Sequence, residues 1–192
     1  PTATAKISIG KDGLHAIIFS GNESTLYLDP YTKDSKEYIV YKRSDLESKD
    51  KDFSCEVEDN VTKAVDNSNF QARNANDGKL RTFRLAIVCS GEYAQFHLNR
   101  QSVAASATDA VKKAAVLSAM NTSMTRINGV YEKDLAVRMV IVADNDKVIF
   151  LDAATDNITD GTPNTMINEV QTICDAQIGD ANYDIGHIFS ID

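Results

Sequence analysis

The chain of 192 residues has little of several residue types that would point to a particular function. It has no tryptophan and three prolines, and its nine glycines are scattered singly, so no glycine-rich loop that could cradle a phosphate is present. Lys and Arg number 20 against 28 Asp and Glu, which gives a net charge of -8. Nucleic-acid-binding domains usually carry a basic stripe, so this balance argues against a nucleic-acid partner.

Long apolar runs are also missing. No run approaches the roughly 20 residues that a membrane-spanning helix needs, so the sequence predicts no membrane span. The chain begins at Pro1 and not at Met, so we expect a processed or trimmed product. In such a product the lack of a signal peptide says nothing about export.

Cysteine is scarce, and its count is odd. In a secreted protein, Cys55, Cys89 and Cys174 would leave at least one thiol free or without its partner, whereas three reduced thiols would be ordinary in the cytosol. The sequence does not decide how these cysteines pair. No CxxC spacing occurs, which argues against a closed zinc site. Cys89 with the nearby His97 permits a nucleophilic thiol only weakly.

Histidine pairs are missing as well. A zinc peptidase helix needs two histidines one turn apart with a glutamate between them, and no HExxH motif exists in the chain. His15, His97 and His187 are too far apart to form a local ligand pair. His187 falls in an apolar run, where we expect a structural role.

The first 60 residues have the pattern of short strands separated by turn residues. Residues 15–19, 26–28, 38–41 and 53–57 are the expected strands. Their short spacing predicts an antiparallel meander with no long crossover. Residues 59–79 contain few large apolar side chains and many Asn and Asp, which is typical of a linker or an extended surface segment.

The remaining residues alternate between apolar runs and helical periodicity. Strands are expected at residues 82–89, 135–142, 147–151 and 183–190, and helices at residues 102–131 and 164–178. This order predicts a parallel sheet covered by helices. Residues 144–146 and 156–160 offer oxygen ligands for calcium, but they lack the EF-hand spacing, so solvated loops are the expected alternative.

Several of these segments resemble reprolysin-like, or adamalysin-type, metzincin zinc metallopeptidases. The sequence INGVY at 127–131, followed by LAVRMVI at 135–141, resembles the end of the family's first helix and its second strand. YDIGHIFS at 183–190 resembles the third strand. CSGEY at 89–93 and QTICD at 171–175 are closer still to the bacterial secreted branch. The resemblance covers residues 80–192, and YLDPY at 27–31 with YIVY at 38–41 resembles the end of a propeptide.

The resemblance implies an α+β fold in three parts. Residues 1–60 would form a propeptide-like antiparallel meander, residues 61–80 a linker, and residues 81–192 an incomplete metzincin upper subdomain with a mostly parallel sheet. In the family, the zinc helix and a further strand follow the third strand. We therefore expect a non-catalytic fragment of a secreted zinc endopeptidase, with zinc bound only in the parent protein and proteins or peptides as the parent's substrates. An exposed sheet edge in such a fragment would favour self-association.

Two residue roles follow from the resemblance. Asp184 corresponds to a calcium ligand of reprolysins, but Arg84 stands where its glutamate partner would be, which favours a structural role. Cys55 has the place of a propeptide cysteine that inhibits the enzyme by binding the zinc, against the alternatives of a strand-core cysteine or a disulfide to Cys89. The alternative function for the whole chain is a non-catalytic secreted binding or interaction module.

Overall fold

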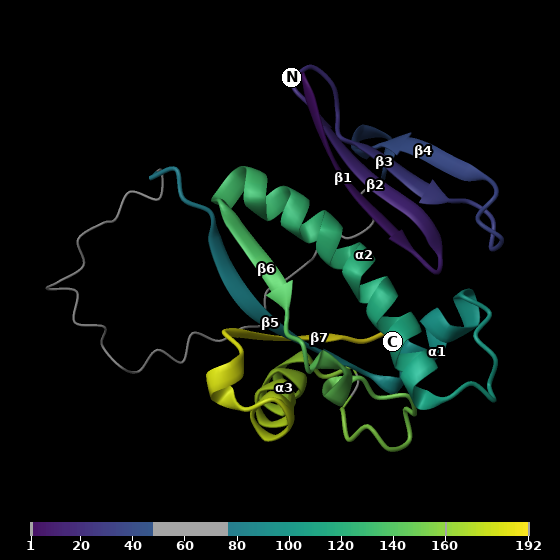
Figure 1. The fold of residues 1–192 in the computed structure, drawn as a ribbon, viewed down its shortest axis with the longest axis vertical. Helices are drawn as coiled ribbons and strands as arrows, with labels where there is room; N and C mark the ends of the chain where they lie inside the picture. Colours follow the sequence, from purple (N-terminus) through teal and green to yellow (C-terminus); the bar gives the residue numbers. More distant parts are fainter. Residues whose placement is uncertain (1, 48–76, 160, 192) are drawn as a thin grey trace, which may run out of the picture.

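The computed structural model describes residues 2–47, 77–159 and 161–191, which form alternating sheet and helix layers (Figure 1). A four-stranded sheet packs on one side of the long helix α2 (Asp109–Leu135), and a three-stranded sheet packs on the other. Helix α3 (Pro163–Gln177) covers the second face of the three-stranded sheet. The mixed α+β class expected from the sequence is confirmed.

The N-terminal sheet is an antiparallel meander, as the turn residues predicted. Its strands follow one another in the order β1 (Ala3–Gly10), β2 (Gly13–Ser20), β3 (Leu26–Pro30) and β4 (Tyr38–Lys42), and a short 3-10 turn (Arg43–Asp45) ends it. Strand β1 is not among the expected strands. Its only large apolar side chains, Ile7 and Ile9, are 59% and 79% exposed, so it has little of the apolar run that marks β2.

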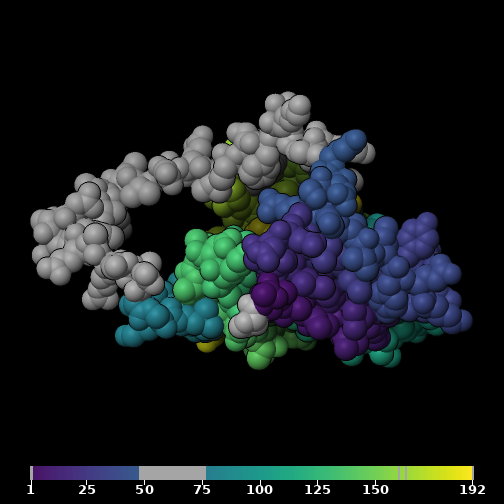
Figure 2. All heavy atoms as spheres, turned by 90° about the horizontal axis from the view of Figure 1, so that it is seen from above, coloured from purple at the N-terminus to yellow at the C-terminus, as the bar shows by residue number. Residues whose placement is uncertain are grey.

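The two faces of this sheet differ in polarity. The face toward α2 carries charged and hydroxyl side chains, including Lys6, Ser8, His15 and Asp29, together with buried Ile17. The strand register places the following apolar residues together on the opposite face: Ile7, Ile9, Leu14, Ala16, Ile18, Leu26, Leu28 and Val40. The N-terminal strands, purple and blue in Figure 2, form one side of the molecule.

Helix α2 approaches the N-terminal sheet closely at Gly129. A side chain there would place its Cβ 3.2 Å from Phe19 and 3.4 Å from Ile17, tighter than ordinary carbon contacts. Glycine lowers helix propensity, but here it lets the two layers touch. The helix was expected to end at residue 131, yet it continues to Leu135 and ends with Ala136 in a left-handed conformation.

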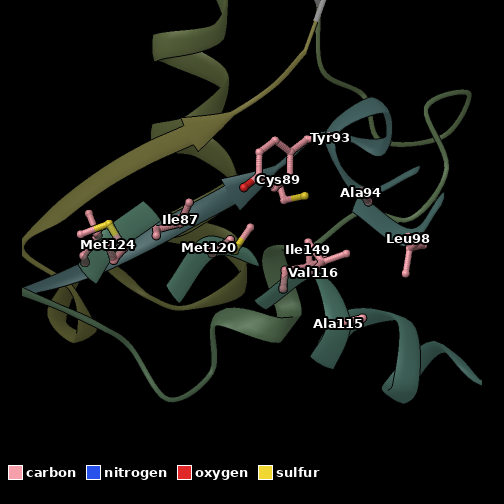
Figure 3. Packing of buried hydrophobic residues seen from close by; sticks show 11 residues of the cluster. Ile87, Cys89, Tyr93, Ala94, Leu98, Ala115, Val116, Met120, Met124 and Ile149 are labelled. Atoms are coloured by element: carbon pink, nitrogen blue, oxygen red, sulfur yellow. The ribbon is translucent and has the colours of Figure 1, made fainter. Parts of the chain in front are cut away.

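The C-terminal sheet is parallel, as predicted, in the order β6 (Val137–Ile141), β5 (Arg81–Cys89) and β7 (Ile185–Phe189). The side chains of β5 alternate between two cores. Leu85, Ile87 and Cys89 pack against α1 (Gly91–Arg100) and α2, where Tyr93, Val116 and Met120 close around them (Figure 3). Ala86 and Val88 face α3.

The region between residues 91 and 151 differs from the expectation at three points. The helix expected from residue 102 begins only at Asp109, because Ser102 adopts a positive φ and Thr108 caps the helix by accepting a hydrogen bond from the backbone of Val111. Helix α1 was not expected at all. Residues 147–151 form no strand beyond one bridge between Ile149 and Cys89, and a 3-10 turn (Asn145–Val148) precedes that bridge.

Other expectations agree with the structure within a few residues. The helix expected at 164–178 is α3, and a short 3-10 turn (Asp180–Asn182) leads from it to β7. The strand expected at 53–57 and the linker, except for residues 77–80, lie outside the described residues.

Candidate functional site

The histidines lie on three separate elements. His15 is on β2, His97 on α1 and His187 on β7. His187 is exposed and packs edge-on against Phe189, with ring centroids 5.5 Å apart. Within residues 2–47, 77–159 and 161–191, no three His, Cys, Asp or Glu side chains form a group that could hold a metal ion.

Asp184 is paired with Arg84. The Arg84 guanidinium donates to Oδ1 of Asp184 at 2.7 Å, and the Arg84 backbone N–H donates to Oδ2 at 2.6 Å. The side-chain hydrogen bond from Arg84 holds the pKa of this carboxyl below its usual range. These hydrogen bonds from Arg84 to the Asp184 carboxylate join the first half of β5 to the start of β7. The structure gives no support to a calcium site at Asp184.

The two acidic loops considered for calcium have internal partners. Asp144 forms an ion pair with Lys147 at 2.7 Å. Asp156 is 2% exposed, so the expectation of a solvated loop is wrong for this residue. Its carboxylate accepts hydrogen bonds from the backbone N–H of Gly91 at 2.8 Å and of Ile158 at 3.1 Å. It thereby lies at the N-terminus of α1, where a negative charge is favourable.

The described cysteines, Cys89 and Cys174, are buried free thiols. Burial raises the pKa of Cys89 to about 12 and that of Cys174 to about 11. A reactive thiol needs the opposite shift, so neither residue fits a nucleophile. The Cys89 thiol donates to the Ser90 carbonyl, and the His97 ring lies tilted against Tyr93, with ring centroids 4.4 Å apart. Cys55, the candidate latency cysteine, lies outside the described residues.

A charged cluster joins the N-terminal sheet to α2, and its centre is Asp29. The Asp29 carboxylate accepts hydrogen bonds from His15 Nδ1 at 2.6 Å, from the Tyr41 hydroxyl at 2.7 Å and from the Arg126 guanidinium. The other ring nitrogen of His15 lies 3.2 Å from Asp12 Oδ2. Arg126 also lies over the Tyr27 ring, 5.6 Å from its centroid. One carboxylate thus links three strands to the helix.

The cluster changes the protonation of its members. The hydrogen bonds to Asp12 and Asp29 raise the pKa of His15 to about 9. Burial raises the pKa of Asp29, but the hydrogen bonds from His15 and Tyr41 and the charge of Arg126 outweigh it, so that the pKa falls to about 2. At neutral pH, His15 is therefore a buried cation between two carboxylates.

Beside this cluster is a cleft of about 390 Å³ between the N-terminal sheet and helices α1 and α2. Its lining residues come from both parts of the chain: Asp12, His15, Asp29, Ile39, Tyr41, Phe96, His97, Arg100, Ala119, Thr122, Ser123 and Arg126. Sequence reasoning missed this site. Strand alternation could have placed His15 and Asp29 on one sheet face, but no local pattern relates them to Arg126.

The two outer edges of the parallel sheet differ. At the outer edge of β6, the side chain of Asn128 from helix α2 accepts from the Met139 N–H and donates to the Met139 carbonyl, both at 2.8 Å. This amide therefore binds the backbone groups of Met139 that a neighbouring strand would otherwise use. Among the described residues, no strand pairs with β7 on the side away from β5. In the described part of the chain, a further strand could therefore pair with β7, whereas at β6 the Asn128 amide already binds the backbone of Met139.

Comparison with known proteins finds a family match for part of the chain. Residues 117–192, from the middle of α2 through β7, match the family model described as Metallo-peptidase family M12B Reprolysin-like. This confirms the resemblance to reprolysin-like metallopeptidases for that segment. No curated protein and no solved structure shows significant similarity to the chain. None of the described helices combines the length and apolarity that crossing a membrane requires.

Proposed function

We propose, from the premise that residues 117–192 are part of a reprolysin-like metallopeptidase domain, that this chain is a non-catalytic piece of a secreted zinc endopeptidase. In this proposal residues 81–192 supply the upper subdomain of the catalytic domain and the N-terminal sheet is the end of a propeptide. The family match carries the proposal, and peptides or proteins are the substrate class that it implies for the parent protein.

Zinc chemistry is assigned to the parent protein and not to these residues. In such enzymes the bound metal activates a water molecule while a glutamate acts as general base. His15, His97 and His187 do not fit that site, because each projects from a different element and none has a second histidine one turn away. We infer that the ligands come from outside these 192 residues.

The open edge of β7 supports this division. A parallel strand with an unpaired edge and the half-buried apolar side chains Ile188 and Phe189 is suited to receive a further strand. The parent enzyme would supply that strand in the same chain. Ile185 is 36% exposed, so the strand is not fully covered by the described residues.

The N-terminal sheet has the properties expected of a docked propeptide. It contacts the rest of the described structure mainly through α2. Much of that contact is polar, with Asp29 bound to Arg126 and Lys6 bound to Glu132. Polar interfaces of this kind are typical of parts that separate, whereas permanent interfaces are more apolar.

The test compares the present chain with a longer chain that continues to an HExxH helix. Purified residues 1–192 should bind zinc no more tightly than about micromolar and hydrolyse neither casein nor gelatin, because the helical histidine pair is missing. The longer chain should contain stoichiometric zinc and hydrolyse casein once processed. Stoichiometric zinc in the short chain, or no peptidase activity in the processed long chain, would overturn the proposal.

Self-association of the short chain is part of the same proposal. We expect residues 1–192 to form dimers through β7 in sedimentation experiments. Ile185→Lys, which places a charge on the open edge, should shift the population toward monomer. Val140→Lys on β6 serves as the matched control, because Val140 is also exposed, and it should leave the population unchanged since the proposed dimer does not involve β6. Monomers at all concentrations would reject the dimer.

A further inference from the structure

We propose that the cleft between the N-terminal sheet and helices α1 and α2 binds a carboxylate that carries an adjacent apolar group, such as the C-terminal residue of a peptide. The inference does not depend on the metallopeptidase assignment. It rests on the residues that line the cleft, on an unpaired arginine, and on buried polar atoms in the cleft wall.

The charge balance of the cleft favours an anion. His15, Arg100 and Arg126 are cations at neutral pH, while Asp12 and Asp29 are the lining carboxylates. Both carboxylates are engaged, since Asp29 accepts from three donors and Asp12 lies against His15. A positive site on a chain with a net charge of -8 is a local reversal of sign.

Arg100 is the cation of the cleft that no described carboxylate holds by a hydrogen bond, although its charge contributes to lowering the pKa of Asp12. It lies at the C-terminal end of α1, is exposed, and lines the cleft. Its guanidinium forms no hydrogen bond or ion pair with any other residue that the structure describes. Guanidinium groups bind carboxylates through two parallel hydrogen bonds, so Arg100 is the primary anchor in this proposal.

The cleft wall contains further polar atoms without partners among the described residues. These are Arg126 Nε, His97 Nδ1 and Asp12 Oδ1. The side chains of His15 and Asp12 are both only 9% exposed. Buried polar atoms nearly always have a hydrogen-bond partner, so several unpaired atoms around one cleft mark a place suited to a polar ligand.

Two apolar side chains at the rim of the cleft are the reason for proposing an apolar group on the ligand. Ile39 and Phe96 line the cleft and are 42% and 50% exposed, so one apolar side chain stands on the sheet and one on α1. A ligand with a charged end and an apolar body would cover both side chains while its carboxylate reaches Arg100. Mostly apolar contacts with a few placed polar groups are usual for small-ligand sites.

The experiment titrates the purified chain with three probes and follows binding by calorimetry. N-acetyl-phenylalanine carries both groups, its carboxamide lacks the charge, and acetate lacks the ring. We expect N-acetyl-phenylalanine to bind with a Kd of about 1 mM or tighter, and each of the other two probes to bind at least about tenfold more weakly. A peptide that ends in phenylalanine, with a free or amidated C-terminus, then separates a peptide ligand from a small free acid.

Variants locate the site. Arg100→Gln should weaken N-acetyl-phenylalanine by about tenfold while leaving its carboxamide unaffected, because only the charged probe uses the guanidinium. Arg43→Gln, which changes an exposed arginine in the 3-10 turn after β4 and outside the cleft, should change nothing. Equal binding of the acid and its carboxamide, or equal loss in both variants, would overturn the proposal. So would the absence of binding at about 10 mM, which is weaker than any specific site of this kind.

Discussion

The side chain of Asn145 and the backbone of Ile87 are bonded to each other twice. Asn145 Oδ1 accepts from the Ile87 N–H at 2.7 Å, and Asn145 Nδ2 donates to the Ile87 carbonyl at 3.0 Å. Strand β6 ends at Ile141, and beyond that point the Asn145 side chain provides the hydrogen bonds that a continuing strand would give to β5. Asn145 and Ile87 are fully buried, and backbone groups buried there need such a partner.

Asn145→Ala should therefore destabilise the protein by about 2–4 kcal/mol, because it leaves a buried N–H and a buried carbonyl without partners. Urea denaturation should show a lower midpoint with an unchanged slope. Asn121→Ala, an exposed asparagine on α2, is the matched control and should change the stability by less than about 0.5 kcal/mol. Equal stability of the two variants would contradict the role given to Asn145.

The stability of the protein should depend on the charge of His15. Its pKa is raised to about 9 from 6.5, so the folded state favours the protonated ring. This contribution is complete below pH 6.5 and is lost as the pH rises through 9, with an upper bound of about 3 kcal/mol. Burial lowers the pKa of His97, which therefore acts in the opposite direction and only at lower pH.

The measurement is the free energy of unfolding between pH 6 and pH 9.5. His15→Gln should be less stable than the original chain at pH 6, and the difference should shrink toward pH 9.5. A difference that stays constant over this range would show that His15 acts through packing and not through its charge.

Gly91→Ala should destabilise the protein although alanine is the better helix former. A Cβ at Gly91 would lie 2.1 Å from the backbone nitrogen of Ala153 and 2.4 Å from the carbonyl carbon of Asp152. Since the obstacle is backbone, we expect a loss of at least about 2 kcal/mol in thermal or urea unfolding. At Gly21 the nearest atom would be 3.7 Å away, so Gly21→Ala is the neutral control.

The thiols of Cys89 and Cys174 should react slowly with thiol reagents in the folded protein and rapidly in denaturant. Both are buried, and their raised pKa values leave almost no thiolate at neutral pH. Titration of Cys89→Ala and Cys174→Ala variants assigns each signal. Rapid reaction of Cys174 under native conditions, or its protection in denaturant by a disulfide, would contradict this prediction.

Local patterns in the sequence were enough for most of the fold. The apolar runs of β5 and β7 and the periodicity of α2 and α3 come from contacts with neighbouring layers, which leave a repeat in the sequence. Helix α1 was not predicted although Ser90 caps it locally by accepting from the Tyr93 N–H; its second contact, from the Gly91 N–H to Asp156, spans 65 residues and leaves no local pattern. The strand expected at 147–151 was wrong because a side chain, Asn145, fills that edge.

The candidate site could not be predicted for a similar reason. Asp29 and Arg126 are 97 residues apart, and in the sequence each looks like an ordinary charged surface residue. Arg84 and Asp184 were both noticed through the resemblance, yet only the structure shows that they bind each other. Ionic contacts between distant elements leave no periodic signal, whereas buried apolar faces do.

The side-chain amide beside β6 bears on how copies of the molecule would meet if they associate as proposed. A sheet with two open edges can add copies at both ends and grow into a fibre. Here Asn128 binds the backbone of Met139 on one edge, whereas no described strand covers the outer side of β7. Two copies that joined through β7 would use the same surface on each side, so this association would close at a pair.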